Sequence, residues 1–147
     1  IGEVVEAVLD MEGAMVCGFI IAEEKWFASK NGILFADLCS VGPDAVMVDN
    51  QHIVRQVSNI WMVGHSYYLR DLCNKQIFTD AGLCLGVLVD INFERTTGEI
   101  KWYELSDGII TDLLYGRMIM PLPPTQIIGT DNIIVPEAMA SLLHTET

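Results

Sequence analysis

The segments Val41-Gly-Pro-Asp-Ala-Val-Met-Val48 and Ile128-Gly-Thr-Asp-Asn-Ile-Ile-Val135 share one pattern, a glycine-aspartate turn followed by an apolar strand. Gly with positive φ, and Asp bonding to its own backbone, are typical of tight turns. The match extends backwards along the chain, where Gly2 aligns with Gly86. The chain is therefore a tandem repeat of about 85 residues. That length exceeds the roughly 20 to 50 residues of a solenoid or propeller repeat, so each copy is predicted to be a small domain.

Each repeat is predicted to contain a β-hairpin, an irregular stretch, a short apolar strand and the final strand after the glycine turn. Asp10 to Gly13 form the predicted hairpin turn of repeat one, and Glu94 to Gly98 that of repeat two, which has one more turn residue. Pro136 and Glu137 favour the first turn of a helix, so residues 136–143 are predicted to form a helical turn or two.

Repeat two has an additional short strand, residues 76–79, ahead of its hairpin, and repeat one has no counterpart. Either the natural chain begins before Ile1 or another segment fills this place, and we favour the first explanation. The edge beside residues 2–9 is then expected to be exposed, paired with another molecule, or covered by a segment from elsewhere, because unpaired backbone donors are costly when buried.

The composition indicates a folded chain that does not cross a membrane. Of the 147 residues 51% are hydrophobic, and the mean hydropathy is +0.37, so there is enough apolar content for two small cores. The longest apolar run, Ala14 to Ala22, is about nine residues. A bilayer needs about 20, so we expect this run to be a buried strand and no segment to span a membrane.

The net charge is −12, from 8 basic and 20 acidic residues, and it is shared by both halves of the chain. Such a surface repels nucleic-acid backbones and anionic lipids, so we expect no direct nucleic-acid binding. It attracts a basic protein partner. Alternatively, the acidity only keeps an apolar protein soluble.

The cysteines and histidines do not predict a metal site. The four cysteines have no Cys-x-x-Cys spacing, and Cys17 and Cys84 are flanked by apolar residues, so we expect buried thiols in a reducing, cytoplasmic setting. His52, His65 and His144 have no ligand at suitable spacing and are expected on the surface or in the linker.

No motif predicts catalysis or a cofactor. Nucleophile elbows, phosphate loops and dinucleotide fingerprints are missing from the sequence, so we expect no catalytic, cofactor-binding or metal-binding residues. Acidic pairs that do not recur between the repeats are expected to be solvated, and the proline run at 121–124 to be a strand exit rather than a ligand for a proline-binding module. The acidic pairs are Glu23 with Glu24 and Asp10 with Glu12.

The large aromatic side chains have two interpretations. On a binding face they anchor a partner, whereas in an apolar protein they more often pack in a core or between domains, and we favour packing. These aromatic residues are Trp26, Phe27, Trp61, Trp102 and Tyr103.

The order of these motifs in both repeats resembles the PRC-barrel family: Gly-x-(Val/Leu)-x-(Glu/Asp), an apolar strand after a glycine-closed turn, and (Val/Ile)-Gly-x-Asp before the last strand. Leu72-Cys-Asn-Lys-Gln-Ile77 is similar to the opening Gly-Lys-x-Val element of that family, with Asn74 in the place of Gly. Relatives in the family include the cytoplasmic domain of the photosynthetic reaction-centre H subunit and the C-terminal domain of a ribosome maturation factor. The resemblance implies that the recurrent turn residues determine the fold and form no site: Gly2, Gly13, Gly42, Asp44, Gly86, Gly98, Gly129 and Asp131.

The resemblance implies an all-β chain of two tandem, small antiparallel PRC-type β-barrels with a short C-terminal helical turn. Repeat one is expected at residues 1–60 without its first strand, a linker at 61–68 and repeat two at 69–147. We expect no enzymatic activity but a protein–protein interaction or assembly adaptor, possessing an acidic surface and forming a homodimer. Two alternatives stay open: a small-ligand-binding or enzymatic protein with a pocket between the barrels, and an accessory subunit of a photosynthetic or other membrane complex.

Overall fold

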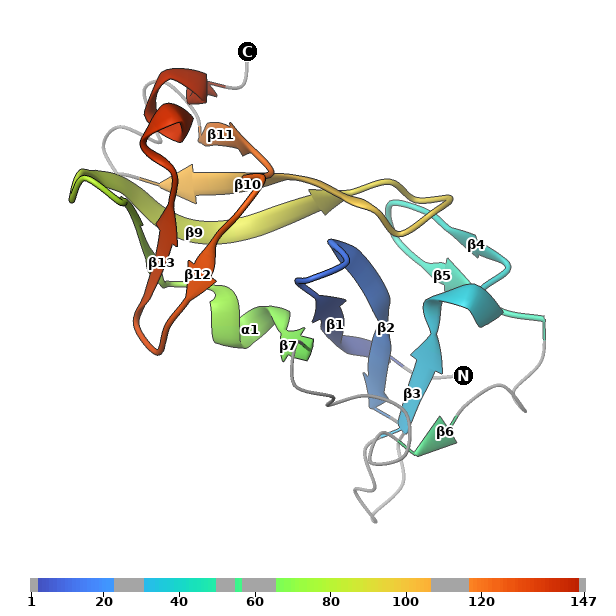
Figure 1. The fold of residues 1–147 in the computed structure, drawn as a ribbon. Helices are drawn as coiled ribbons and strands as arrows, with labels where there is room; N and C mark the ends of the chain where they lie inside the picture. Colours follow the sequence, from blue (N-terminus) through green and yellow to red (C-terminus); the bar gives the residue numbers. More distant parts are fainter. Residues whose placement is uncertain (1–2, 23–30, 50–54, 57–65, 107–116, 146–147) are drawn as a thin grey trace. The chain divides into compact units, whose positions relative to one another are not determined.

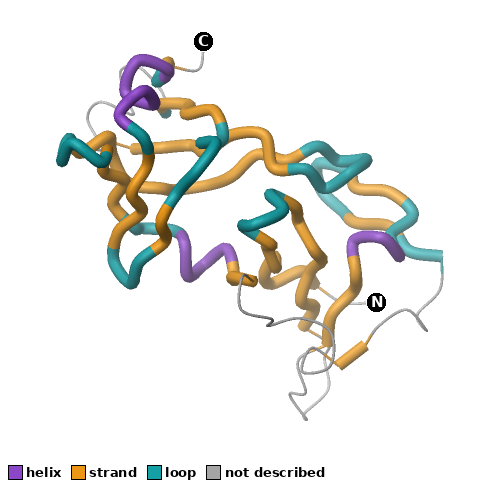
Figure 2. The backbone as a smooth tube through the Cα atoms, in the orientation of Figure 1, coloured by secondary structure: helices purple, strands orange, loops and turns teal. Residues whose placement is uncertain are grey.

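The computed structural model describes residues 3–22, 31–49, 55–56, 66–106 and 117–145. Figure 2 shows that strands dominate the described chain. Within the described residues the helical elements are one turn of α-helix, α1 (Leu69–Leu72), and the 3-10 helices η1 (Phe35–Asp37) and η4 (Glu137–Leu142). The all-β class and the C-terminal helical turn are thus confirmed.

The chain divides into two compact units, which do not follow the repeat boundaries. Unit 1 consists of Ile1–Asp71 together with Phe93–Ile100, and unit 2 of Leu72–Asn92 and Lys101–Thr147. The segment Phe93–Ile100, called the hairpin tip below, comes from repeat two but belongs to unit 1. The domain ranges expected from the repeats remain a prediction.

Unit 1 contains a five-stranded sheet in the order β6-β3-β2-β1-β7, and all four neighbouring pairs are antiparallel (Figure 1). A second, two-stranded sheet is formed by β4 and β5. The strands are β1 (Glu3–Asp10), β2 (Met15–Ala22), β3 (Asn31–Leu34), β4 (Ser40–Val41), β5 (Val46–Met47), β6 (Arg55–Gln56) and β7 (Ser66–Tyr68).

Unit 2 is organised around a seven-stranded sheet in the order β12-β13-β8-β9-β10-β11-β14. β8 pairs in parallel with β13 and antiparallel with β9, which departs from the expected purely antiparallel arrangement. A parallel pair is feasible because a long stretch of chain connects the two strands. The strands are β8 (Gln76–Thr79), β9 (Cys84–Phe93), β10 (Ile100–Ser106), β11 (Met118–Pro121), β12 (Ile127–Ile128), β13 (Asn132–Val135) and β14 (His144–Thr145).

The glycine turns of the two repeats have the same backbone hydrogen bond. Gly42 donates its N–H to the carbonyl of Ala45, and Gly129 donates to Asn132, both at 2.8 Å. The positive φ expected at these glycines is wrong, since neither is among the described residues with positive φ. The turn closes through its hydrogen bond with an ordinary backbone conformation.

The edge of β1 is covered in part by another segment of the chain. β7 pairs with the last three residues of β1, Val8 to Asp10. Glu6 Oε1 accepts hydrogen bonds from the N–H groups of Ala7 and Arg70, at 3.1 and 3.2 Å. Coverage by a segment from elsewhere, one of the three expected outcomes, therefore holds for this half of the strand.

Apolar side chains fill the interior of each unit. In unit 1 Cys17, Leu34 and Tyr68 pack against the buried Val8 and Ile20. In unit 2 the largest fully buried side chain is Tyr103, and residues from β8, β9, β10, β11 and β13 surround the same interior: Ile77, Leu88, Leu105, Met120 and Ile133. Cys17 is half-buried, whereas Cys84 is exposed, so the expected burial of Cys84 is wrong. Cys84 is the first residue of β9, where the sheet leaves its side chain open to solvent.

Candidate binding grooves

The described residues contain no group of three or more His, Cys, Asp or Glu side chains that could hold a metal ion. His144 is exposed on β14, with its Nδ1 at 3.2 Å from the carbonyl of Leu142. His52 and His65 lie outside the described residues, as do Glu23, Glu24, Trp26, Phe27 and Trp61. The absence of a catalytic, cofactor or metal site remains a prediction.

Asp10 has a structural role in the first hairpin. Its Oδ1 accepts hydrogen bonds from the N–H groups of Glu12 and Gly13, at 3.0 and 3.2 Å. This arrangement stabilises the turn between β1 and β2, since an Asp side chain can satisfy backbone donors that a tight turn leaves unpaired.

The two aromatic residues of β10 are packed side chains. Trp102 is half-buried and Tyr103 fully buried, and the Tyr103 hydroxyl donates a hydrogen bond to Gln126 Oε1 at 2.7 Å. Burial raises the pKa of Tyr103 to about 12, against a smaller lowering effect of Gln126. Such a hydroxyl stays protonated at neutral pH and belongs to the core of unit 2.

The proline run begins at the end of a strand, as expected. β11 ends at Pro121, and the following residues lead towards β12.

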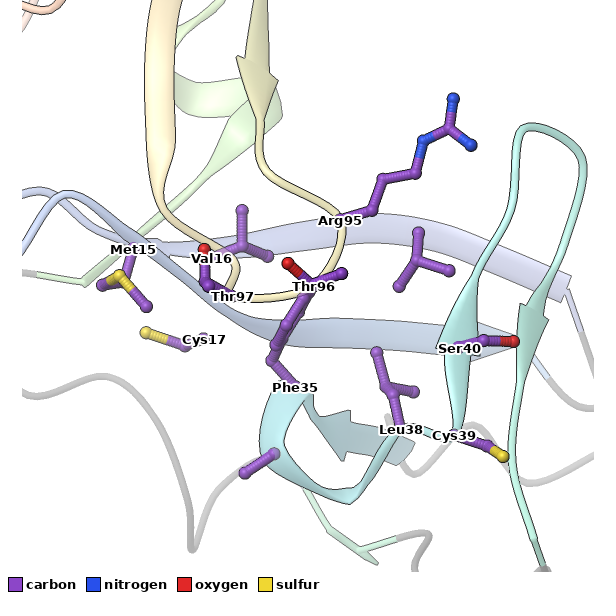
Figure 3. A pocket seen from close by; sticks show the side chains of 12 residues that line it. Met15, Val16, Cys17, Phe35, Leu38, Cys39, Ser40, Arg95, Thr96 and Thr97 are labelled. Atoms are coloured by element: carbon purple, nitrogen blue, oxygen red, sulfur yellow. The ribbon is translucent and has the colours of Figure 1, made fainter.

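Unit 1 has an open groove with a volume of about 640 Å³, called the unit 1 groove below. One part of its lining comes from the start of β2, a second from η1 and the chain that follows it into β4, and a third from the hairpin tip (Figure 3). The lining residues are Met15, Val16, Cys17, Phe35, Ala36, Leu38, Cys39, Ser40, Val41, Arg95, Thr96 and Thr97.

The hairpin tip is attached to β2 by backbone hydrogen bonds. Val16 N–H donates to the carbonyl of Gly98 at 2.7 Å, and Ile100 N–H donates to the carbonyl of Ala14 at 2.8 Å. Phe93 packs against Phe19 and Phe35, with ring centroids 6.4 and 6.2 Å apart. These contacts hold the tip in place as one wall of the groove.

The two thiols of the unit 1 groove are poor nucleophiles. Burial, followed by the negative charge of Asp10, raises the pKa of the Cys17 thiol. A hydrogen bond with Asp49, and then the charge of that carboxylate, raise the pKa of the Cys39 thiol. Because the thiolate is the reactive form, the raised pKa values lower the reactivity of both thiols at neutral pH.

A second groove, of about 770 Å³, lies in unit 2 and is called the unit 2 groove below. Its lining is mostly apolar and includes Leu83, whose side chain is 51% exposed. Its polar side chains are Asn74, Gln76, Cys84 and Ser106. The full lining is Asn74, Gln76, Leu83, Cys84, Leu85, Gly86, Val87, Val89, Ser106, Met118, Ala140 and Leu143.

Sequence reasoning did not identify either groove. Each is lined by residues from three or more segments that are far apart in the chain. In the sequence, the hairpin tip is distinguished only by the extra turn residue of the second hairpin. That residue does not indicate which unit the tip joins.

None of the helices that the structure describes is long and apolar enough to span a membrane.

The family model of the PRC-barrel domain matches residues 64–139. The match covers 76 of the 147 residues, and thus more than half of the chain. It includes α1 and every strand from β7 to β13 and ends within η4. In a comparison with curated proteins, no sequence matches the chain.

Proposed function

The chain belongs to the PRC-barrel family, and from this premise we propose that it is a non-enzymatic binding module of two PRC barrels in tandem, which acts as an adaptor for a basic protein partner. The unit 2 groove and the exposed apolar side chains of the same unit carry this proposal. The acidity of the chain supports the choice of partner.

The repeated strand order supports the tandem arrangement. In unit 1, β1, β2 and β3 are neighbours in the sheet, and β4 pairs with β5; β9, β10 and β11 are neighbours in unit 2, where β12 pairs with β13. The identical hydrogen bonds at Gly42 and Gly129 add a local match. β7 lies next to β1 as β8 lies next to β9, but the β4–β5 hairpin is a separate sheet in unit 1, whereas β13 pairs with β8 in unit 2.

Exposed leucines support docking of a protein on unit 2. Leu83 and Leu142 are 51% and 48% exposed, and the neighbours of Leu142 in the chain, Leu143 and Ala140, line the unit 2 groove. An open apolar patch rimmed by polar groups is typical of an interaction site. The lining contains no Asp, Glu, His, Lys or Arg, which supports binding rather than acid–base catalysis.

Charge supports a basic partner. The chain has a net charge of −12, and Asp80, Asp131 and Glu137 are exposed on unit 2. Opposite charge on the partner accelerates association at low salt, while the apolar groove supplies affinity that salt does not weaken. Four free cysteines suit a reducing compartment, so we place this function in the cytoplasm.

Immobilised full-length protein in native lysate at low and high salt tests this function. We expect recovery of a basic protein, weaker at high salt, and its purified form should bind the immobilised chain directly. Leu83→Ser should weaken that binding about fivefold or more, since a central apolar side chain in an interface contributes over about 1 kcal/mol.

Ile127→Ser is the matched control. Ile127 is the more exposed side chain, at 69%, but it does not line the unit 2 groove. A partner that binds the Leu83→Ser and Ile127→Ser variants equally well would refute docking on the groove, and recovery of acidic proteins only would refute the partner class.

A further inference from the structure

Arg95 has no intramolecular partner among the described residues, in contrast to Arg70, Lys75, Lys101 and Arg117. The Arg70 and Arg117 guanidinium groups form ion pairs with Glu6 at 3.6 Å and with Glu104 at 3.2 Å. Lys75 Nζ donates hydrogen bonds to the carbonyls of Gly129 and Thr130, both at 2.6 Å. Lys101 is also engaged within the chain. Arg95 is exposed and lines the unit 1 groove.

Arg95 is the cation among the side chains that line the unit 1 groove, and the carboxylates of Asp10 and Asp49, whose charges act on its thiols, lie beside the lining. Arg95, Cys17 and Cys39 are its ionisable side chains, and no Asp or Glu is among the lining residues. Both thiols are neutral at neutral pH because their pKa values are raised. The lining therefore has a formal charge of +1, whereas the chain has −12.

The rest of the groove is suited to an aliphatic group. Val16, Phe35, Leu38 and Val41 supply an apolar surface, and Met15 and the neutral thiols add polarizable sulfur. In Figure 3, Phe35 and Leu38 lie on one side of Thr96, and Arg95 extends away from them. The cation thus stands at the rim, where a charged head group keeps its contact with water while a chain lies in the groove. The volume of about 640 Å³ is within the range of small-molecule sites, roughly 300 to 1,000 Å³.

The wall that presents Arg95 is firmly positioned. A Cβ added to Gly98 would lie 3.2 Å from Phe35 Cδ1 and 3.1 Å from the carbonyl oxygen of Val16, so the backbone of the tip is packed closely on unit 1. The Thr97 hydroxyl accepts a hydrogen bond from Glu99 N–H, and that of Thr96 donates to Glu94 Oε1, which orders the turn around Arg95.

We propose that the unit 1 groove binds a small carboxylate with a linear aliphatic chain, in which the carboxylate pairs with Arg95 and the chain lies along Phe35, Leu38 and Val41. This site is distinct from the unit 2 groove that the adaptor function uses. The protein thus binds a small ligand in the unit 1 groove as well as a protein partner on unit 2.

Titration calorimetry on the full chain tests the site with three ligands of equal chain length, octanoate, octanol and octylammonium. Octanoate should bind most tightly and octylammonium most weakly. Decanoate has two more methylenes than octanoate and should bind about fifteenfold more tightly, because each buried methylene adds about a fourfold gain.

Arg95→Gln should reduce octanoate affinity about threefold to fivefold, to that of octanol, because an exposed ion pair contributes about that much. Arg117→Gln is the matched charge control and should leave all affinities unchanged, since Arg117 already pairs with Glu104. Leu38→Ser should lower the affinity for all three ligands by the same factor. Melting temperatures should confirm that each variant is folded.

Amide chemical shifts locate the site independently of affinity. Octanoate should shift the resonances of residues 35–41 and 95–97. Equal binding of octanoate and octanol, an Arg95→Gln variant that binds octanoate like the wild type, shifts confined to other residues, or no saturable binding would each overturn the proposal.

Discussion

Asn74 and Ala14 both have a positive φ, 72° and 54°. Residues other than Gly and Asn rarely adopt this backbone conformation. Asn74 stands where the PRC-barrel opening has Gly, and its backbone N–H donates to the carbonyl of Leu88 at 2.8 Å. Asn74 thus adopts the left-handed conformation, which the sequence analysis expected Asn to tolerate at this position. Ala14 has no such compensation, since Ala lacks a polar side chain that bonds to the local backbone.

Replacing Ala14 with Gly should stabilise the protein. We expect Ala14→Gly to raise the free energy of unfolding by about 1 kcal/mol, since the left-handed conformation costs an L-residue about 1 to 2 kcal/mol and Gly adds a smaller entropic cost. Urea denaturation measures the change. Ala45→Gly is the control: Ala45 lacks a positive φ, and its substitution should destabilise by about 0.5 kcal/mol. A loss of stability in both variants would contradict the explanation.

Alanine substitutions at Gly86 and Gly82 distinguish the steric cost of an added Cβ from the cost of its backbone conformation. Gly86 has φ +137°, and an added Cβ would lie 2.9 Å from the carbonyl oxygen of Ser106, whereas Gly82 has φ +91° and no atom within 4 Å. Gly86→Ala should therefore cost about 3 kcal/mol and Gly82→Ala about 1 kcal/mol, as measured by thermal and urea unfolding. Equal losses would show that the close approach of Ser106 does not matter.

The phenol of Tyr103 makes stability depend on alkaline pH. Its pKa is about 12 in the folded chain and near 10 when unfolded, so the folded state holds the proton more tightly. The resulting stability, about 2 to 3 kcal/mol, is present below pH 10 and is lost as the pH rises through 12. Absorbance at 295 nm should show one tyrosine ionising late, and Tyr103→Phe should remove it. Ionisation of every tyrosine near pH 10 in the folded protein would refute this assignment.

At the scale of elements, the hairpin tip depends on a cluster of three aromatic rings. Phe93 packs against Phe19 and Phe35, which are themselves 6.5 Å apart, and the tip has its two backbone hydrogen bonds beside them. Although the hairpin tip is part of repeat two in the sequence, these contacts attach it to unit 1. The same contacts position Arg95 at the unit 1 groove.

Phe93→Ala should loosen the tip without unfolding the protein. We expect amide hydrogen exchange of Val16 and Ile100, the donors of the two hydrogen bonds, to become at least tenfold faster, and stability to fall by about 2 kcal/mol for a half-buried ring. Amides of β8 serve as the internal control. Unchanged protection at Val16 and Ile100 would show that the hydrogen bonds hold the tip by themselves.

The strands themselves follow from local sequence. The predicted strand at 76–79 is β8, the final strand at 132–135 is β13, and the hairpin turns fall at the predicted residues. Alternation and turn residues act over a few positions, so the sequence alone can locate them. The separate β4–β5 sheet could not be foreseen, because it depends on whether β5 pairs with a neighbouring strand as β13 pairs with β8.

At the scale of the whole molecule, the exposed apolar side chains predict self-association. Small domains bury a smaller fraction of their surface, and Val5 and Met47, which lie outside the unit 2 groove, are 54% and 55% exposed. Light scattering at micromolar concentration should report a homodimer. Val5→Ser with Met47→Ser should shift it towards monomer, and a wild-type protein that is monomeric at every concentration would remove the prediction.

The sequence by itself determined the repeat, the all-β class, the turns and the family, because these depend on residue type and on spacing along the chain. Tertiary structure alone decided that β7 covers part of the β1 edge, that β13 runs parallel to β8 and that Cys84 is exposed. It also decided that Arg95 stands at the unit 1 groove. Each of these depends on which distant segments come together, and that choice is made by the packing of the whole unit, which no local pattern encodes.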